Sequence, residues 1–291
     1  MNIKTLEDNR YWIWLSLIEG LGSIRKQILL KEYQLPENIY NLKKADILKI
    51  KGFNEILADK ITNKENKEKT ERYIEKMEKE NVQIISIEDE EYPSILRNIY
   101  DYPITLYIKG NYKALNNVSL GIVGCREAST YGVNVAEYFA YNLAKQGINI
   151  VSGLAKGIDS HSHIGALKAK GITIGVIGSG LDIVYPKENQ YLYEKIIKEN
   201  GAILSEYPLG VKPEKMNFPA RNRIISGISK GIIVVEAKKK SGTLLTVDFA
   251  LEQGRDVYVV PGNINEINSV GTNDLIKQGA KIATTYRDIE I

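Results

Sequence analysis

Hydrophobic and polar positions follow two different rhythms along the 291 residues of the chain. In residues 1–80, apolar side chains recur at helical spacing over 11–19 and 24–30, and the turn 20–22 (Gly-Leu-Gly) separates these two runs. A looser copy of this pattern surrounds Gly52, and the Lys- and Glu-rich stretch 62–81 predicts a solvated helix. Residues 1–80 are therefore expected to form a small helical domain.

From residue 81 onward, short apolar runs alternate with glycine-rich turns and amphipathic helices. The runs predict strands at 82–87, 104–108, 120–123, 148–151, 173–177, 202–205, 232–236 and 257–260. Strands that alternate with helices imply right-handed crossovers and a mainly parallel sheet with helices on both faces. Residues 81–291 are therefore expected to form one extended Rossmann-like α/β domain.

Four glycine-rich turns follow predicted strands, with the sequences GCREAS, SGLAKG, GSGLD and SGTLLT. The carboxyl ends of parallel strands share one edge of a sheet, and helix starts there present backbone N–H groups to anions. Ser129 or Thr130 is expected to cap the first of these helices, and the guanidinium of Arg126 can grip a phosphate. The sequence thus predicts an anion-binding edge formed by Gly124, Cys125, Arg126, Ser129, Ser152, Gly153, Lys156, Gly157, Gly178, Ser179, Gly180, Ser241, Gly242 and Thr243.

A basic segment, NFPARNRIISGIS, supplies a second candidate surface within the positively charged stretch 210–240. Arg221 and Arg223 flank Asn222 at a predicted helix start, and Phe218 comes just before them. Arginines beside an aromatic ring can hold backbone phosphate while a nucleobase stacks on the ring. The alternative is that Phe218 belongs to the core and that the arginines bind carboxylates.

The helical start also permits two interpretations. A helix, a glycine turn and a second helix are the outline of a helix-hairpin-helix unit, in which backbone N–H groups face a DNA phosphate. The same pattern is typical of a small helical bundle whose glycines cap helices. The second copy has only one glycine in its turn, at Gly52, and both interpretations stay open.

Cofactor, metal and catalytic motifs are missing from the sequence, so we expect none of the three. The turn at 178–180 lacks the third glycine of a dinucleotide fingerprint, and without a Gly-Lys dipeptide there is no Walker A loop. His161 and His163, the only histidines, point to different sides of a helix and do not form a metal pair. Cys125 beside Arg126 could have a lowered pKa, but a role as a small turn residue is the simpler expectation.

The amino-acid composition indicates a cellular compartment but does not indicate a function. The formal net charge of +3 is too balanced to indicate nucleic acid by itself, and a single cysteine suits a reducing cytosol. No apolar run approaches the roughly 18 residues that a membrane span requires. We therefore expect a cytoplasmic protein with no membrane partner.

Taken in order, the motifs resemble those of the DNA-processing protein A family (DprA, also called Smf). The resemblance covers roughly residues 92–280 and rests on the strings GIVGCREASTYG, SGLAKGIDSHSHIGAL, GVIGSGLDIVYP, FPARNRIISGISKGIIVVEA, SGTLLT, ALEQGRDVYVVPG and GTNDLIKQGA. It implies a sterile-alpha-motif-like helical start and an extended Rossmann fold that works without nucleotide or catalysis. It also implies a cytosolic homodimer that binds single-stranded DNA and loads the RecA recombinase onto it, notably in natural transformation.

The resemblance assigns roles to two arginines. Arg126 matches the arginine of the family's G-[SA]-R turn, its leading single-strand contact, and Arg221 falls in the second basic motif. On this basis, replacing either arginine by alanine is expected to weaken single-strand binding alike. Cys125 stands where the family usually has Ser or Ala, and Ser162 stands where Ala is usual.

Two rival classes of enzyme and one assembly state remain to be tested. A Rossmann-like nucleotide phosphoribohydrolase would need a catalytic glutamate, and Thr246 stands at the comparable place. A pyridine-nucleotide oxidoreductase is disfavoured by the incomplete glycine fingerprint.

The apolar, turn-rich segment 257–282 is expected to carry the homodimer contact.

Overall fold

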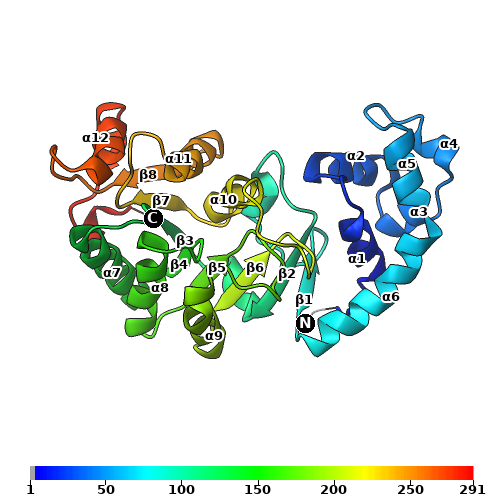
Figure 1. Cartoon of the computed structure of the whole chain (residues 1–291), viewed down its shortest axis with the longest axis horizontal. Coiled ribbons are helices and arrows are strands. Elements are labelled where there is room, and N and C mark those ends of the chain that lie inside the picture. The colour runs from blue at the N-terminus through cyan, green and yellow to red at the C-terminus, as the bar shows by residue number, and fades with distance from the viewer. Residues whose placement is uncertain (1–3, 291) are drawn as a thin grey trace. The chain divides into compact units, whose positions relative to one another are not determined.

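The computed structural model describes residues 4–290, apart from the side chain of Lys67. The chain divides into two compact units, each described separately below (Figure 1). The helical unit comprises Met1–Tyr92 and Asp101–Tyr107, and the sheet unit comprises Pro93–Tyr100 and Ile108–Ile291. The boundary expected between residues 80 and 81 thus lies inside the helical unit.

The helical unit contains the helices predicted at 11–19 and 24–30, around Gly52 and at 62–81, and also a short helix at 36–40 that the pattern did not predict. They are α1 (Arg10–Leu17), α2 (Ser23–Tyr33), α3 (Pro36–Tyr40), α4 (Lys44–Ile47), α5 (Glu55–Thr62) and α6 (Lys64–Lys79). Gly20 and Gly52, with φ of 78° and 92°, make the turns before α2 and α5. Such left-handed backbone favours glycine, which explains both interruptions of the pattern. The unit also holds strand β1 (Gln83–Ser86) and the first half of β2 (Thr105–Gly110).

The sheet unit has parallel strands in the order β6-β5-β4-β3-β7-β8-β9. Their bounds are β3 (Ser119–Val123), β4 (Asn149–Ser152), β5 (Thr173–Val176), β6 (Ala202–Ser205), β7 (Gly231–Val234), β8 (Asp256–Val259) and β9 (Lys281–Ile282). Strands β3 to β7 are buried along their whole length, which is why they appear in the sequence as short continuous apolar runs. The predicted parallel Rossmann-like sheet is confirmed.

Helices cover both faces of this sheet (Figure 1). They are α7 (Thr130–Lys145), α8 (Ile158–Lys168), α9 (Gln190–Lys198), α10 (Asn217–Gly227), α11 (Gly242–Glu252) and α12 (Val270–Lys277). Alternate residues of β3 show how the layers are made. Leu120 and Ile122 pack in the cluster that contains α7, whereas a side chain at Gly121 would collide with Ile232 and touch Ile225 of α10.

The strand order contains a topological switch point. From β3 the chain moves outward through β4, β5 and β6, and then returns to place β7 on the other side of β3. Crossovers that leave β3 in opposite directions open a crevice at the carboxyl ends of β3 and β7, where α/β sheets bind their ligands. Among the described helices, none is long and apolar enough to cross a membrane.

Candidate nucleic-acid interface

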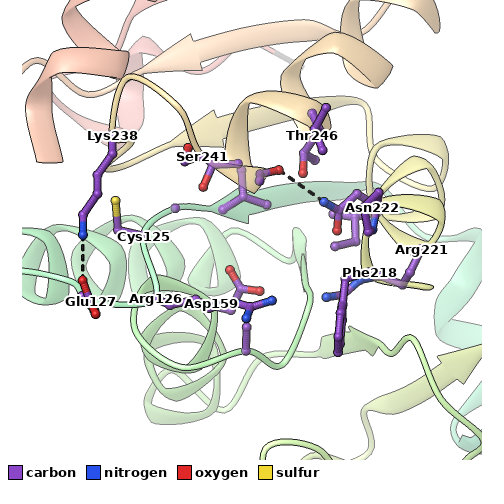
Figure 2. Close-up of a pocket in the computed structure, with 18 of the residues that line it drawn as sticks. Cys125, Arg126, Glu127, Asp159, Phe218, Arg221, Asn222, Lys238, Ser241 and Thr246 are labelled. Carbon is purple, nitrogen blue, oxygen red and sulfur yellow. Dashed lines mark hydrogen bonds and ion pairs between the residues drawn. The ribbon is translucent and has the colours of Figure 1, made fainter. Parts of the chain in front are cut away.

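A cavity of about 620 Å³ lies at this switch point (Figure 2). Its lining residues come from 123–127 after β3, from 155–159 after β4, from 215–225 at the start of α10, and from 238–246 after β7, together with Tyr185. Pockets for small ligands measure roughly 300–1,000 Å³, so this cavity has the size for one ligand such as a nucleotide. The turn containing Arg126, the Phe218 segment and the SGTLLT turn thus meet around one space.

Arg126 lies exposed at the mouth of the cavity, on the turn after β3. Its guanidinium carbon lies 5.3 Å from the centroid of the Phe218 ring, which is a cation–π contact. The centroid of the Phe218 ring in turn lies 5.6 Å from that of Tyr185, a residue that is 47% exposed. No carboxylate among the described residues pairs with Arg126. The mouth therefore combines an available cation with two aromatic rings.

Arg221 occupies the wall of the cavity and is only 4% exposed. Its Nη1 donates to the carbonyl oxygens of Gly153, at 2.6 Å, and of Val176. Its Nε is buried without a hydrogen-bond partner among the described residues. Burial lowers the pKa of Arg221 to about 10, and the neighbouring Asp159 opposes that shift. Arg221 therefore brings a positive charge to the wall at neutral pH while it also holds the ends of β4 and β5.

Asp159 is the buried counter-charge of Arg221. Its carboxylate accepts a hydrogen bond from the backbone N–H of Gly153 at 3.1 Å. Burial raises the pKa of Asp159, and the charge of Arg221 acts in the opposite direction. A Cβ at Gly153 would collide with both side chains, so the glycine leaves the space in which they meet.

The start of α11 faces the cavity without an internal anion. Ser241 precedes the helix but makes no capping hydrogen bond, and its Oγ is buried with no partner in the described part of the chain. The first turn has no acidic residue, and a Cβ at Gly242 would meet nothing within 4 Å. Because a helix start has partial positive charge and unpaired N–H groups, Ser241, Gly242 and Thr243 form an open anion-binding site.

The start of α7 differs, and here the expectation of free N–H groups is wrong. Of the two expected caps, Ser129 is the one that caps the helix, because its Oγ accepts from the N–H of Gly132 at 3.0 Å. However, the carboxylate of Glu236 accepts from both the N–H of Ser129, at 3.0 Å, and its hydroxyl. Asn268 donates to the same carboxylate at 3.3 Å. The protein's own Glu236 therefore already occupies this helix start.

The GSGLD turn lies away from the cavity surface. Ser179 is 2% exposed, and its carbonyl oxygen accepts from the hydroxyl of Ser205. A Cβ at Gly178 would lie 3.3 Å from the backbone of Asn217, and the N–H of Gly180 donates to Val211. Residues of β6, of the loop that follows it and of the α10 start therefore cover these three residues, which the strand pattern alone placed on the open edge.

The SGLAKG turn supports the cavity more than it lines it. Ser152 is fully buried and donates to the carbonyl of Ile122 at 2.6 Å. Gly157 has a φ of 76°, and a Cβ there would strike the carbonyl oxygen of Cys125. Gly153 and Lys156 border a smaller hollow of about 60 Å³ beside Arg126 and Phe218, and Lys156 is paired with Glu188 at 2.6 Å.

The basic segment of α10 serves two purposes. Arg223 is 3% exposed and forms two hydrogen bonds with the carboxylate of Glu206, at 2.7 and 2.8 Å, so the carboxylate-binding alternative describes this arginine. Asn222 lines the cavity and donates to the carbonyl of Gly242 at 3.4 Å.

Cys125 is buried in the wall and its pKa is raised by burial, which contradicts a lowered thiol pKa.

Sequence reasoning missed several residues of the cavity wall. Tyr185, Lys215 and Lys238 line it without having been singled out, as do Glu127 and Asp159. Lys238 pairs with Glu127 at 2.6 Å, on the side of the cavity opposite Asn222 (Figure 2). The basic excess in 210–240 pointed to the two lysines, whereas no local signal identified Tyr185.

Fold and cavity together define a class: a Rossmann-like protein with a basic, partly aromatic cavity at its switch point, suited to phosphate and nucleobase. A family model described as DNA recombination-mediator protein A matches residues 83–290, and the chain belongs to this family. Over 94% of its length it is 37% identical to protein Smf of Synechocystis sp., of which it covers 70%. Over 70% of its length it is 46% identical to DNA processing protein DprA of Streptococcus pneumoniae, of which it covers 72%.

Two solved structures are similar to this one. The X-ray structure of DprA from S. pneumoniae has a TM-score of 0.83 and 38% identity, over 99% of this chain and 97% of that one. DprA from Helicobacter pylori, whose structure was reported for its single-stranded DNA binding mode, has a TM-score of 0.64 and 33% identity, over 71% of this chain and 93% of that one. The family resemblance inferred from the motifs is thus confirmed.

Proposed function

We propose that this chain binds single-stranded DNA in the switch-point cavity. The observation that carries the proposal is the mouth of the cavity, where Arg126 lies over the ring of Phe218 with no carboxylate partner in the described part of the chain. Phosphate can meet the guanidinium while an unstacked base lies on the neighbouring rings, an arrangement that a paired duplex cannot use. The reported binding mode of the H. pylori relative supports the same ligand.

Binding of matched oligonucleotides at two salt concentrations tests this proposal. A single strand should bind more tightly than its duplex, and the difference should persist at the higher salt because stacking is not screened. Equal binding of strand and duplex, lost together in salt, would leave only a non-specific basic surface.

We further propose that the chain hands the strand to a RecA-type recombinase in the cytoplasm and acts as a homodimer. Family membership supports the recombinase step, and the family model's description as a recombination mediator agrees with it. In the test, RecA's DNA-dependent ATPase is followed on strands coated with single-strand-binding protein. The ATPase should rise as this protein is added, and a flat response would remove the recombinase step alone.

Binding is proposed to occur without turnover. Two carboxylates of the cavity are engaged, Asp159 beside Arg221 and Glu127 with Lys238, and Thr246 stands where a phosphoribohydrolase would need its acid. Neither carboxylate is therefore an available general base. Steady release of adenine from AMP, or turnover of ATP or NADH by pure protein, would establish the enzymatic alternative.

A further inference from the structure

The charges around the cavity do not balance, and the excess is positive. Two pairs of opposite charges cancel: Arg221 lies beside Asp159, and Lys238 forms an ion pair with Glu127. Arg126 and Lys215 also line the cavity, and neither has a carboxylate partner within residues 4–290. The α11 start adds about half a positive charge. The cavity therefore presents roughly two and a half uncompensated positive charges.

An internal phosphodiester carries one negative charge, whereas a phosphomonoester carries about 1.5 to 2 at pH 7. A single nucleotide with a terminal phosphate thus matches the excess better than one internal nucleotide. The volume of about 620 Å³ also suits one nucleotide.

Two hydrogen-bond donors on residues of the cavity wall have no partner in the described part of the chain. Nε of the nine-tenths-buried Arg221 and Oγ of Ser241 both lack partners among the described residues, and both residues line this cavity. A buried donor without a partner is unfavourable, so a ligand that accepts hydrogen bonds from both donors is stabilised by them. A phosphate monoester has three oxygens that can accept these hydrogen bonds together with N–H groups at the α11 start.

We infer that the cavity binds the phosphomonoester of a single nucleotide, either at the phosphorylated end of a strand or in a free nucleoside monophosphate. This inference rests on the proposed single-strand binding and makes it more specific. The phosphate lies between the α11 start and Arg221, and the base lies toward the rings of Phe218 and Tyr185. Strand ends thereby become preferred sites of first contact.

The test compares short oligothymidylates that differ only at their ends: a phosphate or a hydroxyl at the 5′ end, and the same pair at the 3′ end. One phosphorylated form should bind about tenfold more tightly than its hydroxyl counterpart, as one added charge-assisted hydrogen bond provides. Thymidine 5′-monophosphate should compete with the labelled strand, thymidine should not, and inorganic phosphate should compete more weakly than the nucleotide. If the nucleotide competes but phosphorylated and hydroxyl-ended strands bind equally, the site binds free nucleotides. If the phosphorylated strand binds more tightly but the nucleotide does not compete, the site binds strand ends.

Ser241→Ala should lower the ratio of the affinities for phosphorylated and hydroxyl-ended strands to near one. Lys230→Ala is the matched control, because this exposed lysine just before β7 lies at the opposite edge of the sheet. Equal affinities for all four strands, with no competition by the nucleotide, would show a diester-only site and overturn the inference. That result leaves single-strand binding intact, whereas failure of every strand to bind while the nucleotide still binds would refute the proposed function alone.

Discussion

Replacing Arg126 by alanine should weaken single-strand binding without unfolding the protein. The side chain is exposed, has no ion pair within the described residues, and touches the protein through its contact with the Phe218 ring at 5.3 Å. An exposed cation–π contact contributes about 0.5–1 kcal/mol, which sets the expected loss of stability. A charge-assisted contact to phosphate is worth about 1.5–3 kcal/mol, so the dissociation constant should rise roughly ten- to hundredfold.

Salt dependence identifies the lost contact as a phosphate contact. Each phosphate neutralised on a single strand contributes about 0.7 to the slope of log K against log salt concentration, so the slope for Arg126→Ala should flatten by about this amount. The loss should be similar for different base sequences, because phosphate contacts carry no base information.

Fluorescence anisotropy with a labelled strand, titrated at several salt concentrations, measures both quantities. Lys230→Ala removes the same charge at the other edge of the sheet and should change affinity and slope little. Unchanged affinity and slope in a folded Arg126→Ala protein would refute the assignment of Arg126 as a phosphate contact.

Three further predictions concern stability and assembly. Arg221→Ala should lower the free energy of unfolding by about 3–5 kcal/mol in denaturant titrations, because it leaves buried Asp159 unpaired; an unchanged midpoint would contradict this role. His163 is fully buried, and burial lowers its pKa from 6.5 to about 3. The folded state thus keeps His163 neutral, and stability is lost as the pH falls below about 6.5, because the unfolded state then binds a proton that the folded state does not. Between pH 6.5 and 4.5, the free energy of unfolding should fall by about 2–3 kcal/mol more in the wild type than in His163→Asn. Equal decreases in the two proteins would refute this. Light scattering should give about twice 32.7 kDa, and glutamates at the exposed Ile264 and Ile267 should restore the monomer; a 32.7 kDa wild-type species at micromolar concentration would exclude the dimer.

The sheet was predictable because local pattern and burial coincide in a parallel fold. The run 202–205 predicted β6 with its observed bounds, and the cap of α7, Ser129, was one of the two residues expected there. Helix boundaries were less accurate. Helix α10 was expected around residue 221 but begins at Asn217, so Pro219 lies in its first turn, where a missing N–H costs little.

The sequence could not predict which glycine-rich turns are open and which are covered by the protein's own residues, because the covering residues are distant in sequence. Glu236 fills the start of α7 from 107 residues away, and nothing near Ser129 indicates this. The residues that bury the GSGLD turn belong to β6, to the loop that follows it and to the α10 start, and Tyr185 reaches the Phe218 ring only through tertiary packing. Nothing in the sequence around Arg126 or Arg221 indicates that the first is exposed and the second is held by two backbone carbonyls.

We expect a single strand to lie in the switch-point cavity with a base against Phe218 and Tyr185. Photochemical cross-linking of an oligonucleotide containing 5-iodouracil, followed by mass-spectrometric mapping of the linked peptide, tests this directly. Cross-links should fall on Tyr185 or Phe218 and should decrease when unlabelled single strand, but not duplex, is added. Cross-links confined to the helical unit, or to surfaces of the sheet unit outside the cavity, would contradict the claim.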